Sequence, residues 1–370
     1  MTESTPAVPD DWARFLEWPV YGLTREQKRP RLEAELYKLT RHHAEHCPPY
    51  ANVLSARGVD KQAPGALEEL PMMPVRLFKH YSLRSVSEGE VYKTLYSSGT
   101  SGQAPSRIML DKATAQLQTA SLVRIMQEFL GKARLPMLVL DHPGVVQNRQ
   151  SFSARGAGIL GLSNFGRFHV YALREDMTLD LEAVGAFAER HAGMPKLLFG
   201  FTFMVWQHVV LAYERLGLTA DLDGGILFHS GGWKKLEAMS VINDTFKRRV
   251  LQTMGVRRVH NFYGMVEQVG SVFVECEAGH LHTPSFADLI VREPGSWQPL
   301  PYGRQGVVQV LSCLPRSYPG HSLLTEDLGT VLGEDDCPCG RMGRYFVIHG
   351  RIPRAEARGC GDTQPTRETA

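Results

Sequence analysis

The chain has 370 residues, of which 43% are apolar and 22% charged, and its formal net charge is +2. This balance is typical of a soluble globular protein larger than one average domain, and the small net charge argues against nucleic acid or an anionic membrane as the main partner. No run approaches the ~18 apolar residues of a membrane span, and the polar start MTESTPAVPDDW does not resemble a signal peptide. We therefore expect a cytoplasmic protein.

Residues 1–90 are predicted to be mainly helical. The stretch Arg25–His46 interleaves charged residues with Leu and Tyr, which is typical of a surface helix, and Pro48-Pro49 would end it. Scattered prolines between residues 60 and 90 indicate irregular segments that pack onto a larger body.

From residue 91 onward, predicted strands alternate with predicted helices, which favours a mostly parallel α/β sheet. The expected strands are Val91–Tyr96, Leu135–Leu140, Leu197–Phe199, Ile226–Phe228 and Val256–Phe262. The expected helices are Lys112–Phe129, Leu181–His191, Phe203–Leu216 and Thr245–Met254.

After about residue 270 the pattern changes to short strands divided by Gly and Pro turns. These strands are Val269–Val274, Ala287–Arg292, Gly306–Cys313 and Gly343–His349. They predict a small antiparallel, barrel-like subdomain on the α/β domain, which would extend over residues 91–350. The polar, Arg-rich stretch 351–370 has no apolar periodicity and is interpreted as a flexible tail.

A loop of small and hydroxyl-bearing residues follows Tyr96, and we expect it to join a strand to a helix. Its residues are Ser97, Ser98, Gly99, Thr100, Ser101 and Gly102. Small residues let backbone N–H groups approach phosphate oxygens, and hydroxyls add further donors. The loop lacks the Gly-Lys-Ser/Thr ending of a Walker motif, so a plain surface loop is the alternative to a phosphate site.

The loop resembles the phosphate-binding motif of the adenylate-forming superfamily, which includes acyl-CoA ligases and firefly luciferase. Further motifs of that superfamily follow in the same order. Ser230, Gly231 and Gly232, after His229, resemble the segment that lies against the adenine. The pair Tyr263-Gly264, followed by Glu267, resembles a motif that places an aromatic ring near the adenine and a carboxylate on Mg²⁺. Asp327 resembles the residue that binds the ribose hydroxyls, and Gly350-Arg351 resembles the pair that closes the large domain.

The chemistry implied by the resemblance is the attack of a carboxylate on the α-phosphorus of ATP, which must overcome repulsion between two anions. Mg²⁺, backbone N–H groups and cationic side chains neutralise that charge. Glu267 is the candidate metal ligand, with an ordinary helix-capping acid as the alternative. Asp327 is the candidate ribose ligand, with a turn-forming acid beside Gly329 as the alternative.

The superfamily adds a C-terminal lid domain that carries a lysine for the substrate carboxylate. Only 20 residues follow Gly350 here, so the lid is expected to be lacking. Lys234 and Lys235 follow the Gly-Gly-Trp segment and are candidates for the positive charge, with solvated surface lysines as the alternative. Val266 stands where relatives often have Thr, which removes a hydroxyl from the nucleotide site.

Three cysteines and a histidine in the antiparallel region are suited to a four-coordinate structural zinc. They are Cys276, Cys337, Cys339 and either His280 or His282. The arrangement resembles a zinc site in phenylacetate-CoA ligase-like enzymes, and His282 is preferred because the Leu281-His282 step matches those relatives better. Reduced, half-buried thiols without a metal are the alternative.

Cys360 lies near the C-terminus between two glycines, and Arg354 and Arg358 would favour its reactive thiolate. An ordinary free thiol is the alternative. A lidless adenylating domain with this tail resembles the LuxE family, the acyl-protein synthetases of bacterial luminescence, over residues 15–365. The resemblance implies that a fatty acid is adenylated, that Cys360 takes the acyl group as a thioester, and that a LuxC-like acyl reductase partner receives it.

Two other functions remain open from the sequence. The acyl group could pass to coenzyme A or a carrier protein, with Cys360 idle, or the chain could be a non-catalytic subunit of a reductase complex. The acyl pocket is equally open, because aromatic residues such as Phe199, Phe201, Phe203, Trp206, Phe228 and Trp233 line pockets but more often form core.

Overall fold

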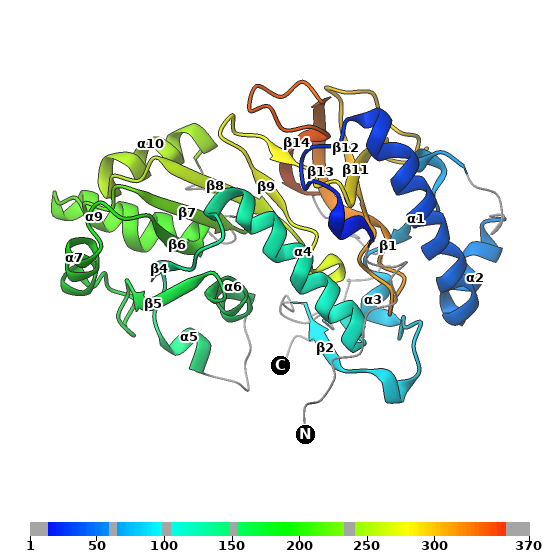
Figure 1. The fold of residues 1–370 in the computed structure, drawn as a ribbon, viewed down its shortest axis with the longest axis horizontal. Coiled ribbons are helices and arrows are strands. Elements are labelled where there is room, and N and C mark those ends of the chain that lie inside the picture. The colour runs from blue at the N-terminus through cyan, green and yellow to red at the C-terminus, as the bar shows by residue number, and fades with distance from the viewer. Residues whose placement is uncertain (1–13, 59–64, 98–104, 148–153, 233–240, 353–370) are drawn as a thin grey trace, which may run out of the picture.

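A computed structural model describes residues 14–58, 65–97, 105–147, 154–232 and 241–352. Its centre is a sheet of twelve strands in the order β11-β12-β13-β14-β10-β9-β8-β7-β6-β4-β5, with β1 (Met73–Pro74) paired beside β13. The predicted α/β fold with parallel and antiparallel parts is confirmed. The two parts are joined edge to edge within this one sheet (Figure 1).

The parallel part consists of five strands, of which the inner three, β4, β6 and β7, are buried at nearly every position because both of their faces are covered. The strands are β4 (Leu135–Val139), β5 (Gly166–Tyr171), β6 (Lys196–Phe201), β7 (Gly225–Ser230) and β8 (Arg258–Tyr263). Successive side chains point to opposite faces. Phe199 and Phe228 therefore join the core beneath α4 (Lys112–Leu130) and α6 (Ala154–Ser163), whereas Leu198 and Leu227 join a second core.

That second core lies under the helices on the opposite face of the sheet, at the left of Figure 1. These are α7 (Leu181–Arg190), α8 (Thr202–Met204), α9 (Leu211–Leu216) and α10 (Asn243–Met254). The predicted helix Phe203–Leu216 is present, but its middle, Val205–Val210, is π-helical. A short helix α5 (Gly144–Gln147) follows β4.

The antiparallel part continues the sheet from β8. Its strands are β9 (Phe273–Glu275), β10 (Leu281–His282), β11 (Ala287–Arg292), β12 (Gln305–Ser312), β13 (Ser322–Glu334) and β14 (Arg344–Arg351). The predicted strand Val269–Val274 was wrong over most of its length, because the turn that follows the 3₁₀ helix Val266–Gln268 extends through Gly270 and β9 begins only at Phe273. Gly270, at φ 88°, lies against α4, where an added Cβ would be 2.6 Å from the Gln118 carbonyl.

The strand after the predicted phosphate loop was also missed. The loop was expected to run into a helix, but β2 (Lys93–Tyr96) pairs antiparallel with β3 (Arg107–Leu110) in a separate two-stranded sheet, and only then does α4 begin. Asp111 caps α4 by accepting a hydrogen bond from the Thr114 backbone N–H at 2.8 Å. The sequence of β3 is too short to distinguish from a helix start by periodicity.

The N-terminal part covers the antiparallel strands, at the right of Figure 1. The long helix α1 spans Arg25–His46 as predicted, and α2 (Pro48–Ala56) follows it. Buried charges fix α1 to the sheet: the Lys28 ammonium lies 3.6 Å from the Asp288 carboxylate and donates to the Thr283 hydroxyl at 2.8 Å. The connection from α2 to β2 contains the short helix α3 (Leu77–His80). Three 3₁₀ turns lie before and between these elements, at Arg14–Glu17, Leu67–Glu69 and Glu88–Glu90.

One edge of the large sheet is irregular. Edge strand β5 carries one more residue than β4 between the pairs Pro136–Arg167 and Leu138–Val170, which is a β-bulge. Within it, Phe168 has φ 51°, and 59% of its side chain surface is exposed between Arg167 and Arg190. At the other edge, β11 is buried along its whole length.

No helix among the residues that the structure describes is both long and apolar enough to cross a membrane.

Candidate functional site

The predicted adenine and tyrosine segments lie side by side at the carboxyl edge of the parallel strands. Because β7 and β8 are parallel neighbours, with Ser230 paired to Phe262, the residues that follow them leave the sheet together. Ser230 ends β7 and is followed by the exposed Gly231 and Gly232, and Tyr263 ends β8 and is followed by Gly264. Gly231 has φ 84°, a conformation that favours glycine, and an added Cβ would be 3.0 Å from the Phe201 ring. Ligands of open α/β sheets bind at this edge.

Asp327 reaches the same place from the antiparallel strands. It lies within β13, where β12 and β14 both pair, rather than in a turn. The Tyr263 hydroxyl donates a hydrogen bond of 2.6 Å to one Asp327 oxygen, and the Arg351 guanidinium lies 4.0 Å from the other. Burial raises the pKa of Asp327, whereas Tyr263 and Arg351 lower it. Burial and the adjacent carboxylate raise the pKa of Tyr263 well above its ordinary value.

Glu267 is buried next to the root of the predicted phosphate loop. Only 6% of its surface is exposed, and burial raises its pKa, while the Ser106 side chain and the more distant Lys79 and Arg351 lower it. Its backbone carbonyl accepts a hydrogen bond of 2.9 Å from the Tyr318 hydroxyl, which fixes the turn. A cation beside such a buried carboxylate would stabilise its ionised form.

Ser97 and Ser106 close the root of the loop. The Ser97 N–H donates to the Ser106 carbonyl at 3.1 Å, and the Ser106 N–H donates to the Ser97 hydroxyl at 2.8 Å. The other predicted loop residues, Ser98, Gly99, Thr100, Ser101 and Gly102, lie outside the described residues. So do the candidates Lys234 and Lys235, Trp233, and the predicted acyl carrier Cys360.

Ser106 and Tyr318 support the site although the sequence did not indicate them. Each acts through Glu267 from a segment far away in the chain, so no local pattern could have identified them. The sequence indicated His229 only as the residue that precedes the segment Ser230-Gly231-Gly232. It is buried against Phe246, its Nδ1 lies 2.9 Å from the Thr202 hydroxyl, and burial lowers its pKa to about 3. A neutral imidazole therefore lies under the glycine segment.

Three of the six aromatic residues weighed for an acyl pocket belong to the core. Phe199 and Phe228 are fully buried and Trp206 is 3% exposed. Phe201 differs, because its partly exposed ring lies between Gly231 and Gly158, where an added Cβ would be 3.2 Å away. Phe201 is thus the aromatic residue of that set that the structure brings to the carboxyl edge.

A second cluster lies where β10 and β14 meet the loops beside them. Ligand atoms of Cys276, His282, Cys337 and Cys339 all lie within 4.8 Å of one another. The Cys276 and Cys337 sulfurs are 3.9 Å apart, and the Cys339 sulfur is 3.3 Å from His282 Nε2. Zinc–sulfur bonds of about 2.3 Å would set tetrahedral ligands roughly 3.8 Å apart. His282 Nδ1 is buried without a hydrogen-bond partner in the described structure.

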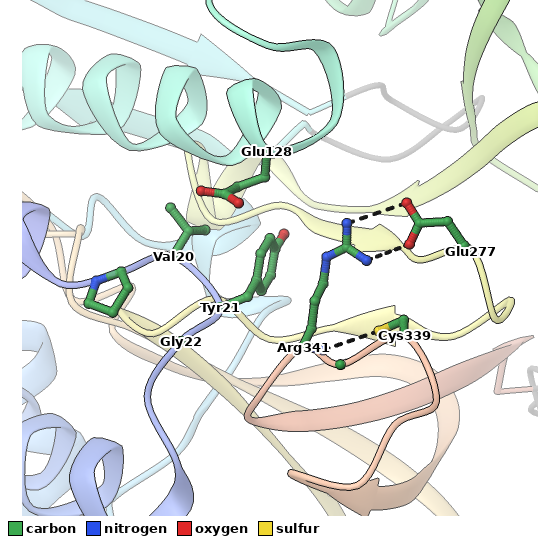
Figure 2. A pocket seen from close by; sticks show the side chains of 9 residues that line it. Val20, Tyr21, Gly22, Glu128, Glu277, Cys339 and Arg341 are labelled. Atoms are coloured by element: carbon green, nitrogen blue, oxygen red, sulfur yellow. Dashed lines mark hydrogen bonds and ion pairs between the residues drawn. The ribbon is translucent and has the colours of Figure 1, made fainter.

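The donor set therefore fits a tetrahedral metal ion. His280 does not belong to the cluster of four: its Nδ1 lies 3.4 Å from the Cys337 sulfur, and its ring stacks on Tyr345. A shallow pocket of about 530 Å³ borders the cluster at Cys339 and Arg341 (Figure 2). Arg341 pairs with Glu277 there and lies over the rings of Phe129 and Tyr21.

The mixed sheet, in which antiparallel strands continue the parallel ones, is the fold of the adenylate-forming ligases. Among solved structures, 2-hydroxyisobutyryl-CoA ligase in an open conformation with 2-HIB-AMP and CoA aligns with a TM-score of 0.67 and 18% identity, over 90% of this chain and 71% of that one. The same ligase in a postadenylation state with 2-HIB-AMP aligns with the same TM-score of 0.67, over 94% of this chain and 72% of that one. At this identity the likeness shows the fold alone.

The family follows from the sequence. The family model "Acyl-protein synthetase, LuxE" matches residues 13–367, and the chain belongs to that family. A long-chain-fatty-acid–luciferin-component ligase of Vibrio harveyi is 24% identical over 360 residues, 94% of this chain and 90% of the relative. The ligase of the same name from Aliivibrio fischeri is 21% identical over 311 residues, which are 80% of this chain and 77% of the relative. The predicted LuxE resemblance is confirmed, and with it ATP-dependent activation of a carboxylic acid as the reaction class.

Proposed function

We propose that the chain activates a fatty acid with ATP to an acyl-adenylate and then carries the acyl group as a thioester on Cys360. The observation that carries the proposal is the meeting of Tyr263, Asp327 and Glu267 at the carboxyl edge beside the root of the phosphate loop. The fatty acid is proposed because the two relatives above are named for long-chain fatty acids.

Each residue has a role in binding the nucleotide. The glycines at 231 and 232 leave backbone open to the adenine, and Tyr263 places its ring beside it. Asp327, held by the Tyr263 hydroxyl, accepts hydrogen bonds from the two ribose hydroxyls. The loop Ser97–Gly102 receives the phosphates through backbone N–H and hydroxyl groups.

Glu267 is the residue that would hold Mg²⁺. The ion would neutralise charge on the phosphates while the acid attacks. A buried carboxylate whose pKa is raised by burial regains its ionised form when a cation lies beside it, so the environment of Glu267 suits this role. Lys234 and Lys235 are the proposed cations for the substrate carboxylate.

The second half-reaction depends on where the tail begins. Arg351 is paired with Asp327 across β13 and β14, so the chain leaves the sheet beside the proposed ribose ligand. Cys360 follows nine residues later, and such a stretch can extend roughly 30 Å. The thiolate would attack the carbonyl of the mixed anhydride, an S–C bond would form, and AMP would leave. A partner acyl reductase would then take the acyl group from the thioester.

The cysteine cluster is proposed as a structural zinc site. Cys276, His282, Cys337 and Cys339 would hold the ion, and a closed set of four protein ligands is typical of structural sites. The ion would tie β10 to the loop that precedes β14.

The test uses intact mass after incubation with ATP, Mg²⁺ and a panel of acids, together with ATP–pyrophosphate exchange. We expect exchange and one acyl adduct per chain in the native protein. A Cys360→Ala variant should keep exchange and lose the adduct. If the variant still self-acylates, Cys360 is not the carrier. If acyl transfer requires added coenzyme A, the chain is a CoA ligase, and if no acid supports exchange, it is a non-catalytic subunit.

A further inference from the structure

The four side chains of the proposed zinc site are unequally buried. Cys276 and His282 are fully buried and Cys337 is 5% exposed, whereas Cys339 is partly exposed. A closed structural site is expected to hide all its ligands from solvent, so the cluster has one open side, at Cys339.

A pocket explains this exposure. The space of about 530 Å³ is lined by the N-terminal segment Pro19–Gly22, by Glu128 at the end of α4, and by Glu277, Cys339 and Arg341 (Figure 2). It is wide enough for small solutes, and the Tyr21 hydroxyl beside it is buried without a hydrogen-bond partner in the described structure. Of the four candidate ligands, only Cys339 lines the pocket.

Arg341 does not close this opening. Its backbone N–H donates to the Cys339 sulfur at 3.4 Å, and its side chain lines the same pocket, paired with Glu277 and packed on Phe129, whose ring centre is 4.7 Å from the guanidinium carbon. With Arg341 in this position Cys339 is still partly exposed, so its sulfur stays accessible while the loop is intact.

We propose that Cys339 is a modification site through which oxidants of the peroxide class and thiol-alkylating agents open the metal centre. The proposal rests on the zinc site of the proposed function. The Cys339 sulfur attacks one peroxide oxygen, the O–O bond breaks and hydroxide leaves, so the sulfur is oxidised to a sulfenic acid and the peroxide is reduced. The modified sulfur is a poor metal ligand, and the ion leaves a site of three.

The loss would reach the N-terminal segment. The Met342 N–H donates to the Tyr21 carbonyl, and Arg341 packs on Tyr21 and Phe129. A loop that is no longer tied through Cys339 would loosen these contacts, so modification of one thiol would weaken the packing of residues 19–22 on the sheet.

The test uses the full chain with Cys360→Ala, purified with its metal, whose content is measured first. Iodoacetamide is added, alkylated peptides are quantified over time, and released zinc is followed with a chelating dye. We expect the initial alkylation of Cys339 to be at least tenfold faster than that of Cys276 and Cys337, with one zinc released for each Cys339 modified. Hydrogen peroxide in place of iodoacetamide should give oxidation at Cys339 first.

Cys47 and Cys313 are internal controls, because both are core residues and should stay unmodified while the protein is folded. In a Cys339→Ser variant, zinc release should no longer respond to low doses of iodoacetamide. Equal initial rates at the three cluster cysteines, or alkylation of Cys339 with zinc retained, would overturn the proposal. Purified protein without zinc would overturn it as well, and ATP–pyrophosphate exchange in the same preparation reports separately on the proposed enzymatic function.

Discussion

At the scale of single residues, the candidate site depends on carboxylates that are buried next to polar partners. Burial raises the pKa of both Asp327 and Glu267, and polar or cationic neighbours partly offset that rise at each. Removing a hydrogen-bonding partner leaves a buried carboxylate with fewer hydrogen bonds. Replacing the carboxylate by an amide removes its charge but keeps the size of the side chain. These two kinds of change therefore separate binding from catalysis.

We expect Tyr263→Phe to weaken nucleotide binding rather than abolish the reaction. The variant keeps the ring but removes the hydroxyl that holds Asp327 at 2.6 Å. The KM for ATP in pyrophosphate exchange should rise about tenfold, and stability should fall by about 1 kcal/mol, typical of one lost hydrogen bond. Tyr302→Phe, which removes an exposed hydroxyl far from the site, is the matched control. An unchanged KM would show that the Tyr263 hydroxyl does not position Asp327.

Glu267→Gln should instead reduce the rate. The amide keeps the size of the side chain but cannot neutralise Mg²⁺, so we expect exchange to fall by about 100-fold, in the range found for a lost electrostatic contact in a transition state. Circular dichroism and melting temperature should be those of the native protein. Exchange within a few-fold of native at saturating Mg²⁺ would contradict the assignment of Glu267 as metal ligand.

At the scale of elements, α1 is held to the antiparallel strands by histidines as well as by Lys28. His43 is fully buried, its ring stacks on that of His321 at 5.0 Å, and its nitrogens contact the Ser85 hydroxyl and the Pro315 carbonyl. Burial lowers the pKa of His43 well below its ordinary value and that of His321 to about 3. Both imidazoles are therefore neutral in the folded chain.

This pair predicts an acid-sensitive fold. The unfolded chain binds protons on both histidines below about pH 6.5 whereas the folded chain does not, so stability is complete above that pH and falls as the pH drops toward 5. Each histidine contributes up to about 1.4 kcal/mol per pH unit in this window. Urea unfolding at pH 7.5 and 5.5 measures the loss, and a His321→Gln variant should lose less over the same interval. Equal losses in both proteins would exclude His321 as a source.

The metal cluster gives a prediction for β10 and β14. If zinc ties these strands together, a strong chelator should lower the melting temperature by several degrees, and readdition of zinc should restore it, because metal binding stabilises the folded state by linkage. Cys276→Ser should show the low melting temperature from the start and no response to the chelator. A chelator effect of equal size in Cys276→Ser would mean that the ion is bound elsewhere.

At the scale of the whole molecule, the sequence predicted the parts whose signals are local. The bounds of α1 follow from amphipathic spacing and Pro48. The parallel strands β4, β6, β7 and β8 were predicted, whereas the edge strand β5 was not. Because parallel strands end at a common edge, the motifs at Ser230 and Tyr263 could be expected to meet. The meeting of Asp327 with Tyr263 came only from the resemblance to a family.

What the sequence missed depends on long-range pairing. Asp327 was weighed as a turn residue beside Gly329, yet it lies in a strand because β12 and β14 hydrogen-bond on either side. The π-helical segment Val205–Val210 and the strand β3 likewise have no distinct local pattern. The Tyr318 hydroxyl reaches the Glu267 carbonyl, and Ser106 comes near enough to lower the Glu267 pKa, only in the folded chain, so no local pattern could predict these roles.

The bulge in β5 has a consequence for how copies of this chain behave in concentrated solution. An exposed edge strand with free N–H and C=O groups is a template for strand addition and aggregation. Of the two edges of the described sheet, β11 is buried, so the hazard lies at β5. There the extra residue, the left-handed backbone of Phe168 and the flanking arginines interrupt the flat surface that another strand would need. Local strain at one residue thus acts as protection against self-association of a twelve-stranded sheet.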